Sequence, residues 1–195
     1  MAFSDRELLA RLIQCEAGGE GENGMKAVAG VVMNRVHAKE IQVILAGKGP
    51  LEKKYRQLAE KLPNPVVMGF YEPERLLDIL HMVDLYVHTS DAEIEGMSCT
   101  EAFACGLVPV IAVAPRSATS QFALDERSLF PAGDSDALAR RIDWWIEHPK
   151  ERKEMELRYA EHAKQYALEE SIKKTEEMFR MAIEEQKAAK ESLRK

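Results

Sequence analysis

The chain has 195 residues, of which 46% are hydrophobic and 31% are charged, and its formal net charge at pH 7 is −6. This length and apolar content suit one folded domain, alone or with an appendage, and the negative charge argues against a nucleic-acid-binding protein. No stretch of about 18 apolar residues occurs, so we expect no membrane-spanning helix.

The three cysteines, Cys15, Cys99 and Cys105, are an odd number, and two of them lie in apolar helical surroundings. This usage predicts reduced thiols and a cytoplasmic protein. The N-terminal stretch carries charges inside its apolar part, which is not typical of a signal peptide. Because no CxxC pair or Cys/His cluster is present, we expect no metal site.

The first 38 residues have the pattern of two helices. Ser4 is placed to cap the first, with Glu7 at the capping-box position, and two glycines at 18–19 end it. Apolar residues at helical spacing predict the second helix over residues 25–38. The β-branched pair at Val31 and Val32 weighs slightly against this helix.

From residue 39 onward, apolar strand-like runs alternate with helical patterns. The five runs cover residues 41–46, 65–70, 85–88, 109–113 and 128–130. This alternation predicts a three-layer αβα fold with a five-stranded parallel sheet and additional helices at both termini. We divide the chain into residues 1–38, an α/β domain over 39–183, and a charged helical tail over 184–195, with a helix break near 166–171.

Two acids eight residues apart, Glu93 and Glu101, flank a turn that opens a helix. In open parallel sheets a ligand sits where strands end and helices begin, so the backbone N–H groups of Met97 and Ser98, just after Gly96, would be free to meet an anion. Glu101 stands among helix residues that look like core, where a carboxylate needs a partner. Solvated loop and helix acids are the alternative interpretation.

Two further strand ends carry candidate binding residues. Gly47, Lys48 and Gly49 follow the first strand and would let the backbone approach a phosphate, although an ordinary turn explains them equally well. Phe70 and Tyr71 end the second strand, where they would flank a nucleobase or simply close the core.

Other polar residues are expected to be structural. The histidines at 37, 81 and 88 have no pair with metal-ligand spacing, so we expect structural or solvated roles for them. The hydroxyl residues of the 117–120 loop follow the fourth strand, and an ordinary capping loop is the favoured interpretation.

Four stretches occur in the order found in one enzyme family: ILAGKGP, VVMGFYEPERLLDIL, DLYVHTSDAEIEGMSCTEAFACGLVPVIA and PAGDSDALARRIDWWIEHPKER. Residues 39–181 resemble the C-terminal half of a retaining GT-B glycosyltransferase of family four. The third stretch is the most specific, because it joins an E-x7-E spacing to EA-x-A-x-G-x-x-PVI. The passage SATSQFALDERSLF looks most like the branch that glucosylates lipids and sterols, including bacterial cholesterol α-glucosyltransferases.

The resemblance implies a nucleotide-sugar site in which a UDP-hexose is the substrate and no cofactor is needed. Glu93 would contact hydroxyls of the donor hexose, and Glu101 would bind the ribose diol. Backbone N–H groups at Gly96, Met97 and Ser98 would face the hexose and the diphosphate. Such enzymes use no divalent metal and retain the anomeric configuration while the departing diphosphate is stabilised by positive groups.

At the other strand ends, the resemblance places Phe70 and Tyr71 beside the uracil and Gly47 and Gly49 beside the phosphates. Two parts of the family's pattern are missing. One is the acceptor-binding N-terminal domain, and the other is the first strand of this half, whose turn supplies an Arg and a Lys to the diphosphate. Lys48 is a local substitute outside that motif, so we expect no efficient transfer by this chain alone.

The stretch ELLARLIQCEAGGEGENGMKAVAGVVMNRV resembles the opening of the spore-cortex-lytic cell-wall hydrolases, in which Glu16 would be the catalytic glutamate. Two family fragments joined within a few residues suggest a chimera. Two alternatives to donor binding therefore remain: a folded chimeric protein without activity, and a peptidoglycan hydrolase acting through Glu16.

The missing strand also has a topological consequence. The family's sheet order is 3-2-1-4-5-6 with strand 1 in the centre. If the gap closes, the remaining strands take the flavodoxin-like order 2-1-3-4-5, with the 25–38 helix on the sheet. If it stays open, a partner chain must fill it, which makes a homo-oligomer the alternative.

Overall fold

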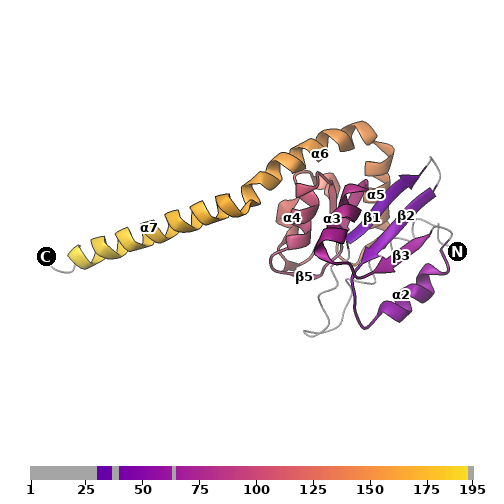
Figure 1. The fold of residues 1–195 in the computed structure, drawn as a ribbon, viewed down its shortest axis with the longest axis horizontal. Coiled ribbons are helices and arrows are strands. Elements are labelled where there is room, and N and C mark those ends of the chain that lie inside the picture. The colour runs from indigo at the N-terminus through magenta and orange to yellow at the C-terminus, as the bar shows by residue number, and fades with distance from the viewer. Residues whose placement is uncertain (1–29, 37–39, 63–64, 193–195) are drawn as a thin grey trace.

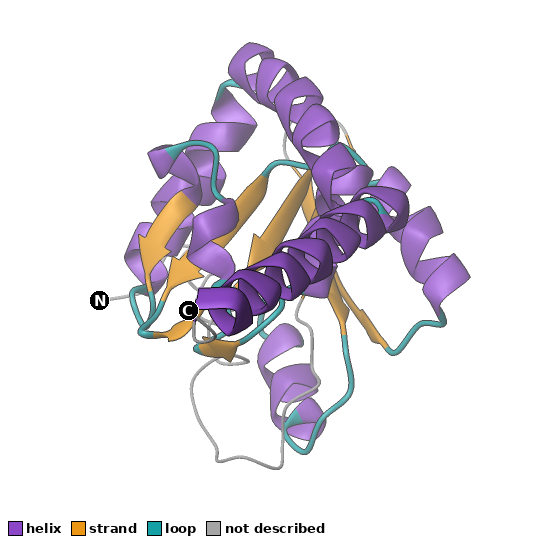
Figure 2. Cartoon of the chain, turned by 90° about the vertical axis from the view of Figure 1, so that its left-hand side faces the viewer, coloured by secondary structure: helices purple, strands orange, loops and turns teal. Residues whose placement is uncertain are grey.

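A computed structural model describes residues 30–36, 40–62 and 65–192. One six-stranded sheet forms the centre of the molecule, with helices on both of its faces (Figures 1 and 2). Its strands are β1 (Gly30–Val36), β2 (Glu40–Ala46), β3 (Val66–Gly69), β4 (Leu85–His88), β6 (Pro109–Val113) and β8 (Leu129–Pro131). The predicted three-layer α/β fold is confirmed.

Six helices are described: α2 (Glu52–Ala59), α3 (Pro73–His81), α4 (Met97–Ala104), α5 (Ser135–Glu147), α6 (Pro149–Ala163) and α7 (Leu168–Ser192). Short 3-10 turns lie at η1 (Thr119–Phe122), η2 (Glu126–Ser128) and η3 (Lys164–Tyr166). The last turn separates α6 from α7, which confirms the predicted helix break. The expected first helix lies outside the described residues.

The predicted helix over residues 25–38 is wrong where the structure describes it, because Gly30–Val36 forms strand β1. This strand pairs antiparallel with β2 from Gly30↔Ala46 to Val36↔Glu40, and with β4 from Val31↔Val87 to Met33↔Leu85. Its valines suit a strand, and its backbone supplies hydrogen-bond partners to two strands that would otherwise lack them. Only three residues join β1 to β2, which permits a hairpin and excludes a parallel crossover.

The sheet order is β3-β2-β1-β4-β6-β8. The five predicted strands are parallel to one another and follow the expected relative order, but the gap between β2 and β4 does not close as the flavodoxin-like order requires. It is not filled by a partner chain either, because β1 of the same chain occupies it. The result is the 3-2-1-4-5-6 order of a Rossmann-like sheet whose first strand runs backwards.

The core is densest around β4, β6 and α4. All four residues of β4 and the first four of β6 are buried. Phe103 of α4 is fully buried, with its ring 5.0 Å from the ring of Tyr159 in α6 and 5.8 Å from that of Phe122. Arg152 of α6, itself buried, pairs with Asp84 at the start of β4 at 2.8 Å. This half of the sheet is therefore held by packing and by charge.

Helix α7 projects away from the rest of the molecule (Figure 1). It crosses residue 184 without interruption, so residues 184–192 of the expected charged tail form its last turns. None of the helices described is both long enough and apolar enough to span a bilayer.

Candidate functional site

The candidate residues gather at the carboxyl end of the sheet, where the five parallel strands finish. Gly47 follows β2 and Phe70 follows β3, while the loop after β4 leads to Glu93 and α4. The reversed strand β1 places Gly30 at this same end, opposite Ala46. The last residues of β1, including Arg35, therefore lie at the opposite end of the sheet. In the family, the turn after the first strand supplies an Arg and a Lys to the diphosphate, and the carboxyl end of β1 does not reach the site to do so.

The Glu93 loop is fixed by hydrogen bonds from two directions. Glu93 Oε1 accepts from the N–H groups of Ile94 at 3.0 Å and Glu95 at 3.3 Å. Its carbonyl oxygen accepts from the N–H of Ala118 at 2.9 Å. The strands β5 (Ala92–Glu93) and β7 (Arg116–Ser117) form a small parallel pair there, which the sequence did not predict. The loop is thus preformed.

Gly96 makes the turn that opens α4, and only glycine fits. Its φ is +64°, in the left-handed region. A Cβ atom here would lie 2.7 Å from Cγ2 of Thr119 and 3.1 Å from Cε2 of Phe122. Both strain and collision therefore exclude a side chain, and Gly96 brings the loop against η1.

The first two N–H groups of α4, those of Met97 and Ser98, have no acceptor among the described residues. The carbonyl oxygen of Gly96 takes the N–H groups of Cys99 at 2.8 Å and Thr100 at 3.3 Å instead. The Met97 side chain is exposed, whereas Ser98 is buried. Two donors at a helix N-terminus, where the helix dipole favours negative charge, can bind an anion.

A buried polar chain lies beneath these donors. The Tyr86 hydroxyl donates to Ser98 Oγ at 2.9 Å and lies 3.0 Å from Nδ1 of His88. Burial lowers the pKa of His88 to about 4, against the opposing effect of Glu93, and burial raises the pKa of Tyr86. Both groups are therefore neutral near pH 7, and His88 is structural, as the sequence suggested. Its Nε2 is buried and has no partner among the described residues.

Glu101 does not have the buried partner that its neighbours suggested. Its side chain is exposed, while Ala102 and Phe103 turn inward and are fully buried. Partial desolvation still raises the pKa of this carboxyl group. Adjacent helix residues point in different directions, so the apolar neighbours of Glu101 in the sequence do not show whether Glu101 itself is buried. Among the described residues no donor is bonded to its carboxylate, which leaves it available to a ligand.

The ends of β2 and β3 form a more exposed part of the site. The N–H of Gly47 donates to the carbonyl oxygen of Gly69 at 2.9 Å, which joins the two loops. Lys48 is exposed, and Phe70 has 67% of its surface exposed. The Tyr71 ring folds back over Gly69, where a Cβ atom would lie 2.9 Å from its Cζ. Phe70 is therefore the aromatic that a planar ligand could reach.

Gly47 and Gly49 do not have a positive φ, so the turn itself does not demand glycine at either position. The hydroxyl groups of Ser117 and Thr119 are buried and bonded to each other at 2.8 Å. This loop supports the Glu93 turn from below, in agreement with the structural interpretation. Thr119 and Phe122 contribute to the site by shaping it around Gly96, and no local pattern in the sequence indicated this.

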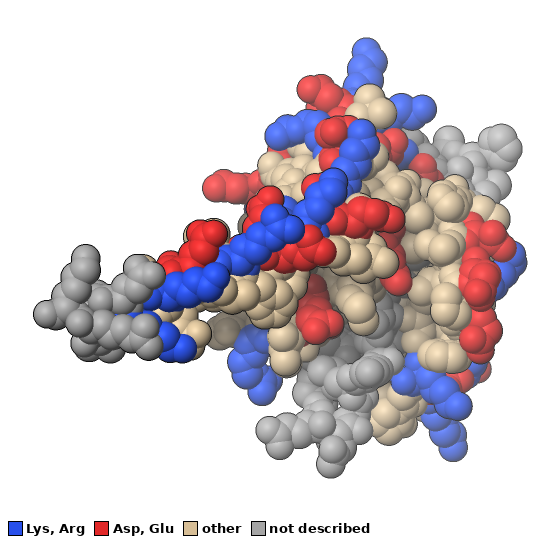
Figure 3. Space-filling view, turned by 60° about the vertical axis from the view of Figure 1, so that its left-hand side comes forward, with Lys and Arg blue, Asp and Glu red and all other residues tan. Residues whose placement is uncertain are grey.

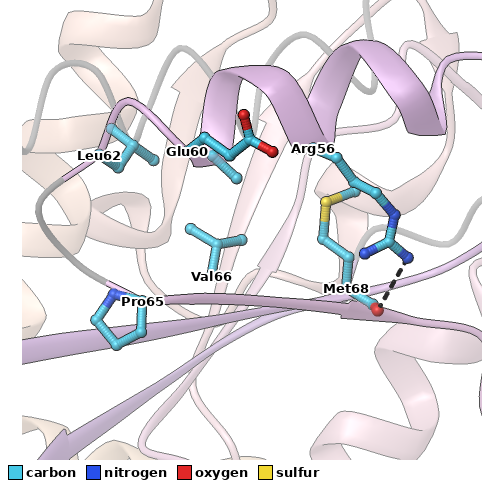
Figure 4. A pocket seen from close by; sticks show the side chains of 7 residues that line it. Arg56, Glu60, Leu62, Pro65, Val66 and Met68 are labelled. Atoms are coloured by element: carbon cyan, nitrogen blue, oxygen red, sulfur yellow. Dashed lines mark hydrogen bonds between the residues drawn. The ribbon is translucent and has the colours of Figure 1, made fainter.

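A hollow of about 420 Å³ lies elsewhere, between α2 and β3 (Figure 4). Its lining residues are Arg56, Ala59, Glu60, Leu62, Pro65, Val66 and Met68. The hollow follows the length of β3 from its amino end and contains none of the candidate residues. Glu16 lies outside the described residues, and within those described no group of three or more His, Cys, Asp or Glu side chains is placed to hold a metal ion.

Known proteins provide the comparison for this geometry. The family model for Glycosyl transferases group 1 matches residues 23–166. The catalytic domain of cholesterol-alpha-glucosyltransferase from Helicobacter pylori is 38% identical and has a TM-score of 0.65, over 83% of this chain and 90% of that one. No curated protein matches the chain.

More distant structures share the fold. Sucrose-phosphate synthase from Thermosynechococcus elongatus has a TM-score of 0.64 at 15% identity, over 92% of this chain and 42% of that one. The pneumococcal O-GlcNAc transferase GtfA, in complex with UDP and GlcNAc, has 0.57 at 17% identity, over 72% and 29%. The chain spans less than half of each of these two enzymes. By the family model and by its identity to the Helicobacter pylori domain, the chain belongs to the Glycosyl transferases group 1 family.

Proposed function

We propose that this chain is the donor-binding half of a retaining glycosyltransferase and binds a UDP-sugar at the carboxyl end of its sheet. The observation that carries the proposal is that the N–H groups of Met97 and Ser98 have no acceptor in the part of the chain that the structure describes and follow the left-handed turn at Gly96. A diphosphate is an anion of the size and charge that such a helix N-terminus favours.

The two carboxylates take different parts of the ligand. One oxygen of Glu93 is bonded within its own loop, which fixes the side chain and leaves the other oxygen to accept from the donor hexose. Glu101, exposed one turn into α4, accepts from the two ribose hydroxyls. The exposed ring of Phe70 stacks on the uracil, while Gly47 and Gly49 pass close to the phosphates.

Transfer needs more than this site contains. The leaving diphosphate must be stabilised by positive charge, and removing such groups typically costs a hundredfold or more in rate. Among the described residues, Lys48 follows β2 and Arg116 lies in β7 beside the Glu93 turn, both exposed, whereas β1 has the reversed direction and brings no counterpart of the family's Arg and Lys from its carboxyl end. The chain therefore binds the donor without efficient turnover. By analogy with the Helicobacter pylori enzyme, the acceptor in an intact enzyme is a sterol or another lipid.

Isothermal titration calorimetry with UDP, UDP-glucose and ADP tests the proposal. We expect both uridine ligands to bind, and Glu101→Ala to abolish the heat because the ribose loses its acceptor. Glu151→Ala, which removes an exposed helix acid in α6, is the matched control and should bind as the parent does. Absence of heat at millimolar UDP and UDP-glucose, with a cooperative melt that ligand does not shift, would instead identify a folded protein without donor binding.

A further inference from the structure

Ser98, the second residue of α4, carries a hydroxyl group beside its own backbone N–H group. That N–H has no acceptor among the described residues, and 9% of the surface of Ser98 is exposed. In a helix each Cα–Cβ bond tilts toward the N-terminus, so the hydroxyl leans toward the end of α4 at which the free N–H groups lie. The Ser98 side chain is therefore placed to add a third donor to the N–H groups of Met97 and Ser98.

Two basic side chains beside the site are both exposed to water. Lys48 follows β2 and Arg116 lies in β7, so solvent screens their attraction for an anion. On the face drawn in Figure 3, basic side chains run along α7, and that helix projects away from the sheet (Figure 1). Uncharged donors that are held in a fixed direction therefore matter for a diphosphate bound here.

Two buried side chains of β4 form a hydrogen-bonded chain beneath Ser98. Tyr86 and His88 are two residues apart on one strand, so their side chains share a face of the sheet. The Tyr86 hydroxyl donates to Ser98 Oγ at 2.9 Å and lies 3.0 Å from Nδ1 of His88. Only 1% of the surface of Tyr86 and 2% of that of His88 is exposed, so water does not compete for these bonds.

The position of the ring hydrogen of neutral His88 decides what Ser98 offers a ligand. With the hydrogen on Nδ1, His88 donates to Tyr86, Tyr86 donates to Ser98, and the Ser98 hydrogen is available for a ligand. With the hydrogen on Nε2, Tyr86 donates to Nδ1 and Ser98 donates to Tyr86. Only lone pairs of Ser98 Oγ would then face the ligand, and these repel an anion.

The burial of His88 favours the first arrangement. Its Nε2 is buried and has no partner in the part of the chain that the structure describes. A hydrogen on Nε2 would therefore be a buried donor without an acceptor, and such orphaned N–H groups are rarer in folded proteins than under-satisfied acceptors. The direction of the bond from Tyr86 to Ser98 agrees with a hydrogen on Nδ1.

We infer that the Ser98 hydroxyl is a third hydrogen-bond donor to the bound diphosphate, and that Tyr86 and His88 are positioning residues that fix its direction. The inference rests on the proposed binding of a UDP-sugar at the N-terminus of α4. It assigns a role to a side chain of this turn, in addition to its backbone.

Calorimetric titration of the full chain with UDP measures the contribution of the hydroxyl. We expect Ser98→Ala to weaken UDP binding about tenfold, because a hydrogen bond to a charged group is lost. Thr100→Ala is the matched control, since it removes a hydroxyl of the same helix that donates to the carbonyl oxygen of Met97 at 2.7 Å. It should bind UDP as the parent does.

The outcomes separate this inference from donor binding itself. No binding by the parent would overturn both. A parent that binds UDP no better than Ser98→Ala would overturn this inference alone, and so would an equal loss from Thr100→Ala.

Tyr86→Phe tests the positioning role, because it keeps the ring and removes the hydroxyl that orients Ser98. It should weaken UDP binding in the parent and have no further effect in Ser98→Ala, since Tyr86 acts through Ser98. A merely structural role for Tyr86 predicts the same loss in both backgrounds, and that result would contradict the inference.

Nitrogen-15 NMR of the histidine rings at pH 7 reads the direction of the chain without any ligand. The signals of His88 are those that disappear in His88→Gln, and we expect the ring hydrogen on Nδ1. A hydrogen on Nε2 would overturn the inference, whether or not UDP binds.

Discussion

The two sides of the candidate site differ in how deeply their residues are buried and how firmly their loops are held by hydrogen bonds. On the α4 side, β4 and most of β6 are buried, and the Glu93 turn is held by hydrogen bonds to its own backbone and to Ala118. On the β2–β3 side, no residue of β3 is fully buried, and Phe70 is exposed. The difference indicates that the diphosphate and sugar meet a preformed surface, while the base meets one that must adapt.

The largest expected difference in the free energy of unfolding is between two variants that each remove one aromatic ring, one on each side of the site. Phe103→Ala leaves a cavity beneath α4 and should lower the free energy of unfolding by about 3–5 kcal/mol. Phe70→Ala, on the β3 side, should change it by no more than about 0.5 kcal/mol because the ring is exposed. Urea unfolding followed by circular dichroism measures both. Equal losses from the two variants would remove the proposed difference between the sides.

The buried histidine on the α4 side should make stability depend on pH. The folded pKa of His88 is about 4, below its unfolded value of 6.5, so between these values the unfolded chain binds more protons. The free energy of unfolding should therefore fall as the pH drops from 6.5 to 4, by up to about 3 kcal/mol. His88→Gln should flatten this dependence, and parallel curves for parent and variant would show that other groups cause it.

Alanine substitutions at two glycines with positive φ distinguish the effect of backbone strain from the effect of a steric clash. Gly96→Ala combines both, because its Cβ would strike Thr119, and should cost about 2–3 kcal/mol and abolish UDP binding. Gly133 has a φ of +87°, and a Cβ atom added there would meet nothing within 4 Å. Gly133→Ala should therefore cost about 1 kcal/mol and leave UDP binding intact. Thermal melts and calorimetry compare them. Similar behaviour of the two variants would mean that the packing of Gly96 against η1 does not shape the site.

The sequence predicted the well-packed side better than the rest. Short apolar runs ended by turn residues gave β4 and β6 their limits, and the Glu93 to Glu101 spacing gave the turn before α4. The strand β1 was not predicted, because Val32, Met33 and Val36 fit a helix face as well as a strand and the β-branched pair at Val31 and Val32 weighed only slightly against the helix. Two neighbouring strands without partners decided its structure, and a local pattern does not report that.

Two features of the site were also beyond the sequence. The pairing of β5 with β7 involves only two residues on each strand, too few for any periodicity to show. The exposure of Glu101 depends on how α4 is rotated over β4 and β6, which its buried neighbours Ala102 and Phe103 do not determine by their order along the chain.

The central claim is that the N-terminus of α4 binds the diphosphate of a UDP-sugar. Backbone amide NMR during titration with UDP-glucose tests it most directly. We expect the Met97 and Ser98 amide signals to shift most, with smaller shifts near Phe70. Shifts confined to the hollow between α2 and β3, around Arg56 and Val66, or no shift at millimolar ligand, would contradict it.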